Sequence, residues 1–251
     1  MIDLIKGDCL IESDKIESGS VDLILTDLPY GTVKDIKNVN HGMSGKCEWD
    51  EVIDTNEIYK IANRILRKNG KMVLTAQQPF TNELINKALP NVPFSYSMIW
   101  EKDHFANALT AKKAPLNYYE DVLVFSKKYD LEGLHPLRLY FKNVIEFIGL
   151  TLKQINIKLG HRRAEHCFYL DSTQFGLCTE KTYLELIKVF NINKLNGFKT
   201  FKELKGIEFK YESRFNLWEG KKYKSNILKY KKDYDGHHPT QKPVLLLEDL
   251  I

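Results

Sequence analysis

The stretch Val21-Asp22-Leu23-Ile24-Leu25-Thr26-Asp27-Leu28-Pro29-Tyr30-Gly31 decides the fold of this 251-residue chain. Its apolar run with β-branched members predicts a buried strand. The strand has to end near Asp27, because Pro29 has no N–H group and a fixed φ. In open α/β sheets, ligands bind at the carboxyl ends of strands. We therefore expect an acid, backbone carbonyl groups and an aromatic ring to lie together at the ligand-binding edge.

The groups at this strand end suit a planar ring that carries an exocyclic amine. Asp27 and the carbonyl groups around Leu28 and Pro29 only accept hydrogen bonds, and an amine offers two N–H donors. Tyr30 offers a flat face for stacking. Accepting hydrogen bonds from the amine keeps electron density on its nitrogen, which makes that nitrogen a better nucleophile. The alternative interpretation is a strand and a turn in which Asp27 caps a helix.

Two segments, one near each end of the chain, carry a family resemblance. Asp27-Leu28-Pro29-Tyr30 resembles the Asp-Pro-Pro-Tyr catalytic motif of the amino-methylating DNA methyltransferases. His238-Pro239-Thr240-Gln241-Lys242-Pro243 resembles the motif that precedes the cofactor-binding strand in the β class of these enzymes. The order of the two motifs along the chain is also that of the β class. The resemblance covers residues 1–130 and 216–251.

The resemblance implies an α/β fold, with a Rossmann-like methyltransferase sheet and a mostly helical inserted target-recognition domain. It implies a site-specific DNA methyltransferase, of the kind found in restriction–modification, that moves a methyl group from S-adenosylmethionine to the exocyclic amine of a flipped base. An acid at the motif's first position favours adenine-N6 and leaves cytosine-N4 open. The expected catalytic residues are Asp27, Pro29 and Tyr30. The expected cofactor-binding residues are Asp8, His238, Thr240, Lys242 and Pro243. Two of them have alternative interpretations: Asp8 as an acid in a turn, and Thr240 as a simple helix cap.

Strand and helix patterns divide the chain into three parts. Apolar alternation or runs predict strands at residues 2–5, 71–76, 94–100 and 118–125, and helical periodicity predicts helices at 54–67 and 81–89. Such alternation of strands and helices favours a parallel sheet. We expect a catalytic α/β region over 1–130, an inserted helical target-recognition domain over 131–215, and a return segment with the second motif over 216–251.

Within the helical part, residues 151–166 predict a helix, a glycine turn and a second helix. Such a pair can place its second helix in the major groove of DNA. Arg162 and Arg163 would then read guanine edges or hold phosphates, while the alternative is surface salt bridges. Lys112 and Lys113 are candidate phosphate contacts near the flipped base, although surface lysines are common.

Charge along the chain is uneven. Residues 1–60 hold 6 Lys/Arg and 13 Asp/Glu, whereas residues 199–232 hold 11 Lys/Arg and 4 Asp/Glu interleaved with aromatic side chains. The basic segment suits double-stranded DNA. The alternative interpretation is a solvated face with ordinary core aromatics.

The sequence contains no apolar run of about 18 residues, so it predicts no membrane span. Four scattered cysteines and no export leader predict a reduced, cytoplasmic protein without a metal site.

The β-class pattern continues beyond the second motif with a Gly-rich turn that binds the cofactor, and no such turn occurs in these 251 residues. We therefore expect a sheet that is incomplete at the C-terminus, as in a truncated enzyme. Self-association or a partner chain that supplies the missing strand would complete it. The alternatives are an inactive remnant that only binds DNA, and a methyltransferase for RNA or a protein amide. Leu28 departs from the motif but leaves the acid, the second proline and the ring in place.

Overall fold

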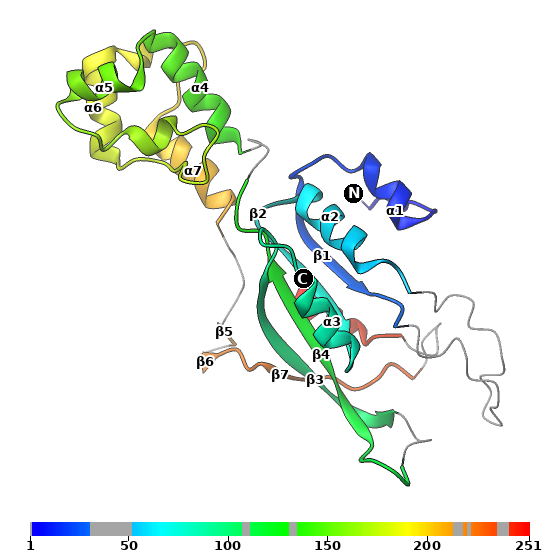
Figure 1. Cartoon of the computed structure of the whole chain (residues 1–251). Coiled ribbons are helices and arrows are strands. Elements are labelled where there is room, and N and C mark those ends of the chain that lie inside the picture. The colour runs from blue at the N-terminus through cyan, green and yellow to red at the C-terminus, as the bar shows by residue number, and fades with distance from the viewer. Residues whose placement is uncertain are drawn as a thin grey trace.

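The computed structural model describes residues 2–30, 52–106, 111–130, 135–212, 218–219, 222–234 and 241–251. These residues form an α/β part built on one sheet and a helical part that lies beyond one end of that sheet (Figure 1). Within the described residues, no helix is both long enough and apolar enough to cross a membrane.

The main sheet has five strands in the order β1-β2-β4-β3-β7. Their bounds are β1 Val21–Asp27, β2 Leu66–Ala76, β3 Phe94–Ala106, β4 Asn117–Ser126 and β7 Ile227–Lys229. β1 runs parallel to β2, and β3 runs parallel to β7, but β4 is antiparallel to both of its neighbours. The expected parallel sheet is therefore corrected to a mixed one. The reason is that β3 and β4 are neighbours joined without a crossover, which forces them to be antiparallel.

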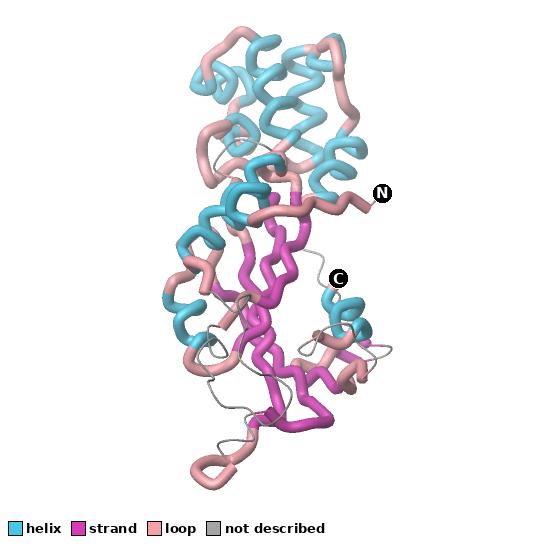
Figure 2. Tube along the Cα trace, turned by 90° about the vertical axis from the view of Figure 1, so that its right-hand side faces the viewer, coloured by secondary structure: helices cyan, strands magenta, loops and turns pink. Residues whose placement is uncertain are grey.

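Short helices cover both faces of this sheet (Figure 2). On one face lie α2 (Thr55–Ile65) and α3 (Phe80–Asn86), which bury apolar side chains against β2 and β4. On the other face α8 (Val244–Leu250) buries Leu246 and Leu250 against the strands. α2 begins directly after Asp54, whose side chain accepts a hydrogen bond from the Asn56 N–H at 2.9 Å.

The helical part has a hydrophobic core of its own. It contains α4 (Pro136–Ile148), α5 (Leu152–Leu159), α6 (Glu180–Phe190) and α7 (Phe201–Lys210). Phe141 and Tyr183 are fully buried at its centre. The rings of Phe198 and Tyr183 stack with centroids 6.3 Å apart. Phe198 and Phe201, at the start of the basic, aromatic-rich stretch, are partly buried and pack against this core.

The helical part joins the sheet at the end opposite Asp27. Asn69, near the start of β2, contacts the chain where it returns from the helices: its Nδ2 donates to the Tyr211 carbonyl at 2.6 Å. The Arg67 guanidinium also lies 5.7 Å from the centre of the Tyr211 ring. Asp27 ends β1 in register with Thr75 near the far end of β2. Figure 1 shows the helical part at one end of the strands and the β3–β4 hairpin reaching out at the other.

Two expected elements are wrong. Residues 2–5 form no strand among the described residues, and Ile2 and Leu4 are 88% and 90% exposed. After α5 the chain does not form the expected second helix at 161–166. It makes a turn and a four-residue 3₁₀ segment, Glu165–Phe168, instead. The described chain also contains a small ribbon of β5 (Trp218–Glu219) and β6 (Lys222–Tyr223), a short α1 (Cys9–Glu12), and short 3₁₀ segments at Ser13–Lys15 and Ile192–Lys194.

Candidate active site

Asp27 projects from the carboxyl end of β1 with one oxygen held by two hydroxyl groups. Its Oδ1 accepts a hydrogen bond from the Tyr30 hydroxyl at 2.9 Å and another from the Thr75 hydroxyl. The parallel register of β1 and β2 brings Thr75 directly opposite Asp27. Leu28 is only 6% exposed and anchors the turn. The Tyr30 ring packs against the Phe80 ring, with 5.5 Å between the ring centroids. These contacts fix the orientation of the carboxylate.

The second oxygen of Asp27 receives an ammonium group from far along the chain. The Lys242 Nζ donates to Asp27 Oδ2 at 2.6 Å, and the same Nζ lies 3.2 Å from Glu120 Oε2. The Lys242 side chain is 10% exposed, whereas that of Asp27 is 36% exposed. The ammonium is therefore mostly inside the site, and the carboxylate faces both the protein and solvent.

A second ion pair lies behind the first. Glu120 on β4 is 6% exposed, and its Oε1 accepts hydrogen bonds from the Lys102 Nζ and from Gln77 Nε2, the latter at 3.2 Å. The Lys102 ammonium also lies 5.1 Å from the centre of the Trp100 ring. Two carboxylates and two ammonium groups thus alternate across the edge of the sheet, and opposite charges offset the cost of burying each one.

Sequence reasoning missed Thr75, Glu120, Lys102 and Gln77. A signal was nevertheless present, because each of them lies at or near the end of a predicted apolar strand. Polar and charged residues at such positions meet at one edge when the strands assemble into a sheet. The pairing itself depends on strand order and register, which the sequence patterns did not give.

Burial and the neighbouring carboxylates of Asp27 and Glu120 raise the pKa of the Tyr30 phenol well above its usual value. The phenol is therefore protonated at any physiological pH. In that form it remains a donor to Asp27 Oδ1. Tyr30 can present its ring to a ligand while its hydroxyl holds the carboxylate in place.

Other predicted cofactor residues lie apart from this cluster or outside the described residues. Asp8 caps α1, with its Oδ1 accepting from the Leu10 N–H at 2.9 Å, as the turn-acid alternative holds. Pro243 is buried and immediately precedes α8. Pro29, one of the expected catalytic residues, is half-buried and directly precedes Tyr30 in the chain. His238 and Thr240 lie outside the described residues.

Lys112 and Lys113 are exposed in the segment that joins β3 to β4. This segment extends from the end of the sheet that carries Asp27 (Figure 1). The structure thus brings these two lysines to the same end of the molecule as the candidate site.

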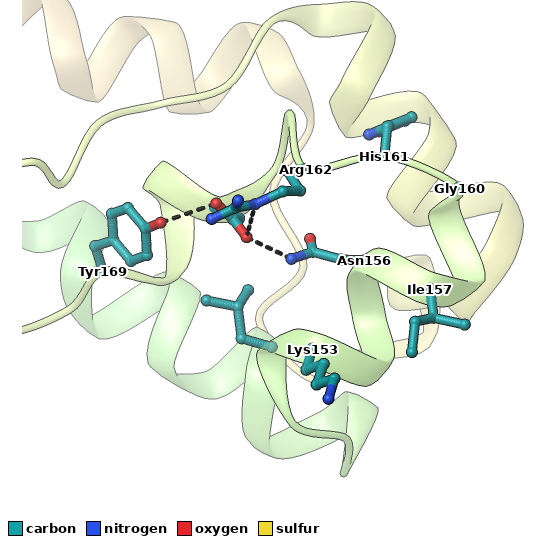
Figure 3. A pocket seen from close by; sticks show the side chains of 9 residues that line it. Lys153, Asn156, Ile157, Gly160, His161, Arg162 and Tyr169 are labelled. Carbon is teal, nitrogen blue, oxygen red and sulfur yellow. Dashed lines mark hydrogen bonds and ion pairs between the residues drawn. The ribbon is translucent and has the colours of Figure 1, made fainter.

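Arg162 and Arg163 lie in the helical part, at the other end, and each is held by a glutamate. The Arg162 Nε donates to Glu165 Oε1 at 2.7 Å, and an Arg163 nitrogen lies 3.1 Å from Glu185. Figure 3 shows Arg162 beside a pocket in which Asn156 and Tyr169 also bond to the Glu165 carboxylate, at 2.5 Å and 2.9 Å. The hydrogen bond from Arg162 is the main reason that the pKa of Glu165 is lowered to about 2. These ion pairs match the surface salt bridges of the alternative interpretation.

Histidines and cysteines of the helical part are used in ordinary contacts. His161 Nε2 lies 2.7 Å from a Glu185 oxygen, and His166 Nδ1 lies 2.9 Å from the Gln174 carbonyl. The Cys178 N–H donates to the Cys167 sulfur at 3.1 Å. Over the part of the chain that the structure describes, no three His, Cys, Asp or Glu side chains gather in a way that could hold a metal ion.

Comparison with known proteins identifies the family. Residues 21–251 match the model of the N6/N4 DNA methylase family. The DNA adenine methyltransferase YhdJ of Escherichia coli (strain K12) is 29% identical over 140 residues, which are 52% of this chain and 44% of that protein. The chain thus aligns with less than half the length of this curated relative.

Solved structures of two other proteins also match parts of this chain. M1.HpyAVI in complex with SAM is 15% identical, with a TM-score of 0.32, over 47% of this chain and 48% of that chain. The Thermus thermophilus protein TTHA0409, assigned as a DNA modification methylase, is 14% identical, with a TM-score of 0.36, over 73% and 72%. Since the family model matches all but the first 20 residues, this chain belongs to the N6/N4 DNA methylase family.

Proposed function

We propose that this chain is a β-class DNA methyltransferase that moves a methyl group from S-adenosylmethionine to the exocyclic amine of a flipped base, adenine-N6 in preference to cytosine-N4. The observation that carries the proposal is the Asp27 carboxylate, held by Tyr30 and Thr75 at the end of β1 and 36% exposed. Membership of the DNA methylase family and the name of the adenine-modifying relative support it.

The proposed roles follow from the geometry of the strand end. Asp27 Oδ2 accepts one N–H of the target amine, and a carbonyl group near Pro29 accepts the other. The ring of Tyr30 stacks on the base, which has to leave the duplex because an amine inside the stack is out of reach. Because Oδ1 is fixed by two hydroxyl groups, Oδ2 stays aimed at the amine. The amine nitrogen retains its electron density and acts as the nucleophile.

S-adenosylmethionine, when bound, supplies the methyl group on a positively charged sulfur. Structures of M1.HpyAVI and TTHA0409 have been solved in complex with it. The described residues of this chain fit the cofactor only in part, because Lys242 is shared by two carboxylates and Asp8 caps a helix. We therefore assign no contact between them and the cofactor. A role for His238, Thr240, Lys242 and Pro243 in holding it remains the sequence-based proposal.

Double-stranded DNA is the proposed partner, and two surfaces are candidates for contact with it. Lys112 and Lys113 lie at the same end of the sheet as Asp27. Arg162 and Arg163 lie beyond the other end, and β1, with its seven residues, alone spans about 20 Å. If both surfaces contact one duplex, the two contacts lie apart along its axis by a large part of one helical turn, which is about 34 Å.

We also propose that residues 131–215 form a domain inserted between the catalytic region, 1–130, and the return segment, 216–251.

The outer edge of β1 is a further point of attachment. Among the described strands, β1 pairs only with β2, so its other edge has unpaired N–H and C=O groups. We propose that a strand from outside the described residues, or from a second chain, pairs with this edge. Such pairing would complete the sheet beside Asp27.

The test is methyl transfer from labelled S-adenosylmethionine to mixed-sequence duplex DNA. We expect Asp27→Ala to lower transfer by about a hundredfold or more, as loss of a reaction-site hydrogen-bonding group does in other enzymes. Asp22→Ala is the matched control, because Asp22 lies on the same strand, is 76% exposed and pairs with Arg67 at the surface. Transfer that survives Asp27→Ala would refute the proposal. Retention of DNA with no transfer by the unchanged chain would favour the second candidate, a DNA-binding protein without catalysis.

A further inference from the structure

Lys242 lies where the target amine would have to bind. Asp27 Oδ1 already accepts hydrogen bonds from two hydroxyl groups, so Oδ2 is the oxygen left for an incoming amine. The Lys242 Nζ is 2.6 Å from that oxygen. An ammonium group at this distance offers Asp27 the same kind of N–H donor that the amine of a base would offer.

We propose that Lys242 is a positioning residue that occupies the amine-binding oxygen of Asp27 in the resting protein and moves onto Glu120 when the amine of a base arrives. The proposal rests on the proposed function, since it concerns the same site. It assigns Lys242 a contact with the catalytic acid, and it assigns Glu120 a part in selecting the base.

Glu120 is suited to receive the ammonium. Its Oε1 is taken by Lys102 and Gln77, but its Oε2 is buried and accepts no hydrogen bond of good geometry from the described residues. A buried acceptor without a hydrogen bond costs free energy, so a donor that reaches it is favoured. The Lys242 Nζ is already 3.2 Å from Oε2. Rotation about the flexible bonds of the lysine side chain is enough to align it.

The movement leaves neither carboxylate without a donor. In the loaded state both ammonium groups are on Glu120, while the Asp27 carboxylate, whose side chain is 36% exposed, keeps its two hydroxyl donors and gains the amine. The movement also improves the acceptor, because an ammonium group on Asp27 Oδ2 draws electron density away from it. Once Lys242 is on Glu120, Asp27 Oδ2 accepts more strongly from the amine.

This exchange gives the site a means of selection. A base that carries an amine replaces the hydrogen bond that Asp27 loses when Lys242 leaves. A ring without an amine leaves Asp27 Oδ2 without a donor from the protein or the ligand, so the exchange is unfavourable. Glu120 therefore makes binding depend on the exocyclic amine rather than on the ring alone.

The first arm of the test follows the Lys242 ammonium by NMR in a chain with ¹⁵N-labelled lysine, with Lys242→Arg used to assign the signal. In Asp27→Asn the acceptor carries an NH₂ group, which mimics the occupied site. We expect the Lys242 signal to shift in this variant, and to shift again in the double variant with Glu120→Gln. If Asp27→Asn and the double variant give the same Lys242 signal, Glu120 is not the second acceptor and the proposal is wrong.

The second arm compares the binding of adenosine with that of purine riboside, which has the same ring without the amine. We expect Glu120→Gln to weaken adenosine binding by about tenfold, or about 1.4 kcal/mol, and to leave purine riboside binding unchanged. Glu101→Gln is the matched control, because Glu101 forms an exposed ion pair with Lys229 on β3 and β7. Preference for adenosine that Glu120→Gln leaves intact would refute the exchange and spare the proposed function. An unchanged chain that fails to distinguish the two nucleosides would refute amine recognition itself.

Discussion

Replacement of Arg138 by methionine provides a sharp test of how the helical part is held together. Arg138 on α4 is 7% exposed, and its guanidinium donates to Asp130 Oδ2 at 3.0 Å. It also donates to four backbone carbonyl groups, those of Asp130, Tyr169, Leu170 and Ser172. Phe175 packs against the guanidinium, with 4.6 Å between Cζ and the ring centre. One side chain thus ties the start of α4 to the segment after the 3₁₀ turn.

The expected magnitude follows from burial. Removal of one partner of a buried ion pair leaves a charge without compensation and costs about 3–5 kcal/mol. Asp130 is 7% exposed, so Arg138→Met falls in this class. Arg163→Met is the matched control, because Arg163 pairs with Glu185 but its side chain is 54% exposed. Loss of such an exposed pair costs about 1 kcal/mol or less.

The assay is urea denaturation followed by circular dichroism, with the free energy of unfolding extrapolated to water. We expect Arg138→Met to lower this free energy by several times the change that Arg163→Met produces. The double variant Arg138→Met, Asp130→Asn should recover part of the loss, because it removes the buried carboxylate that has lost the Arg138 guanidinium. Equal effects of Arg138→Met and Arg163→Met would refute the reasoning.

Three further predictions concern stability, each measured by urea titration. Burial lowers the pKa of His135 to about 4, so the unfolded chain takes up a proton below pH about 6.5 that the folded chain does not. The unfolding free energy should therefore fall as pH drops from about 6.5 to 4, by up to about 1.4 kcal/mol per pH unit, and His135→Asn should remove this slope while keeping a cap acceptor. A Cβ at Gly70 would lie 2.9 Å from one backbone carbonyl oxygen and 3.0 Å from another, so Gly70→Ala should destabilise the sheet. Gly206 lies in α7 with open space around it, so Gly206→Ala should raise the unfolding free energy by about 0.5–1 kcal/mol. A change in the same direction for Gly70→Ala and Gly206→Ala would contradict this account. Thr200 caps α7 with a reciprocal bond to Glu203, so Thr200→Ala should cost about 1 kcal/mol, and an unchanged midpoint would show that the cap is dispensable.

Features that depend on neighbours in the sequence were determined by the sequence alone. The apolar run that ends at Asp27 forms β1, because local preference and the proline that follows act within a few residues. Thr151 caps α5 and Gly160 ends it in the left-handed region, as a helix followed by a glycine turn requires. Membership of the methylase family could also be inferred, because its two motifs are short and local.

The local pattern failed where side chains found partners elsewhere. A second helix after Gly160 was expected from the helix and glycine turn that precede it, but a turn places Arg162 on Glu165 and Arg163 on Glu185 instead. The parallel sheet was expected from the alternation of elements, but the β3–β4 hairpin made it mixed. Pattern reasoning cannot rank these outcomes, because each depends on contacts that form only in the folded chain.

The candidate site shows this division most clearly. Asp27 and Tyr30 were found within one short motif, whereas the contact between Asp27 and Lys242 joins residues 215 positions apart. Glu120 and Lys102 meet because β3 and β4 pair in one register, and a shift of one residue would turn their side chains to opposite faces. The sequence by itself therefore determined which acid is presented at the strand end. Only the tertiary structure decided which charges surround it, because the Coulomb energy of an ion pair depends on distance in space rather than on separation along the chain.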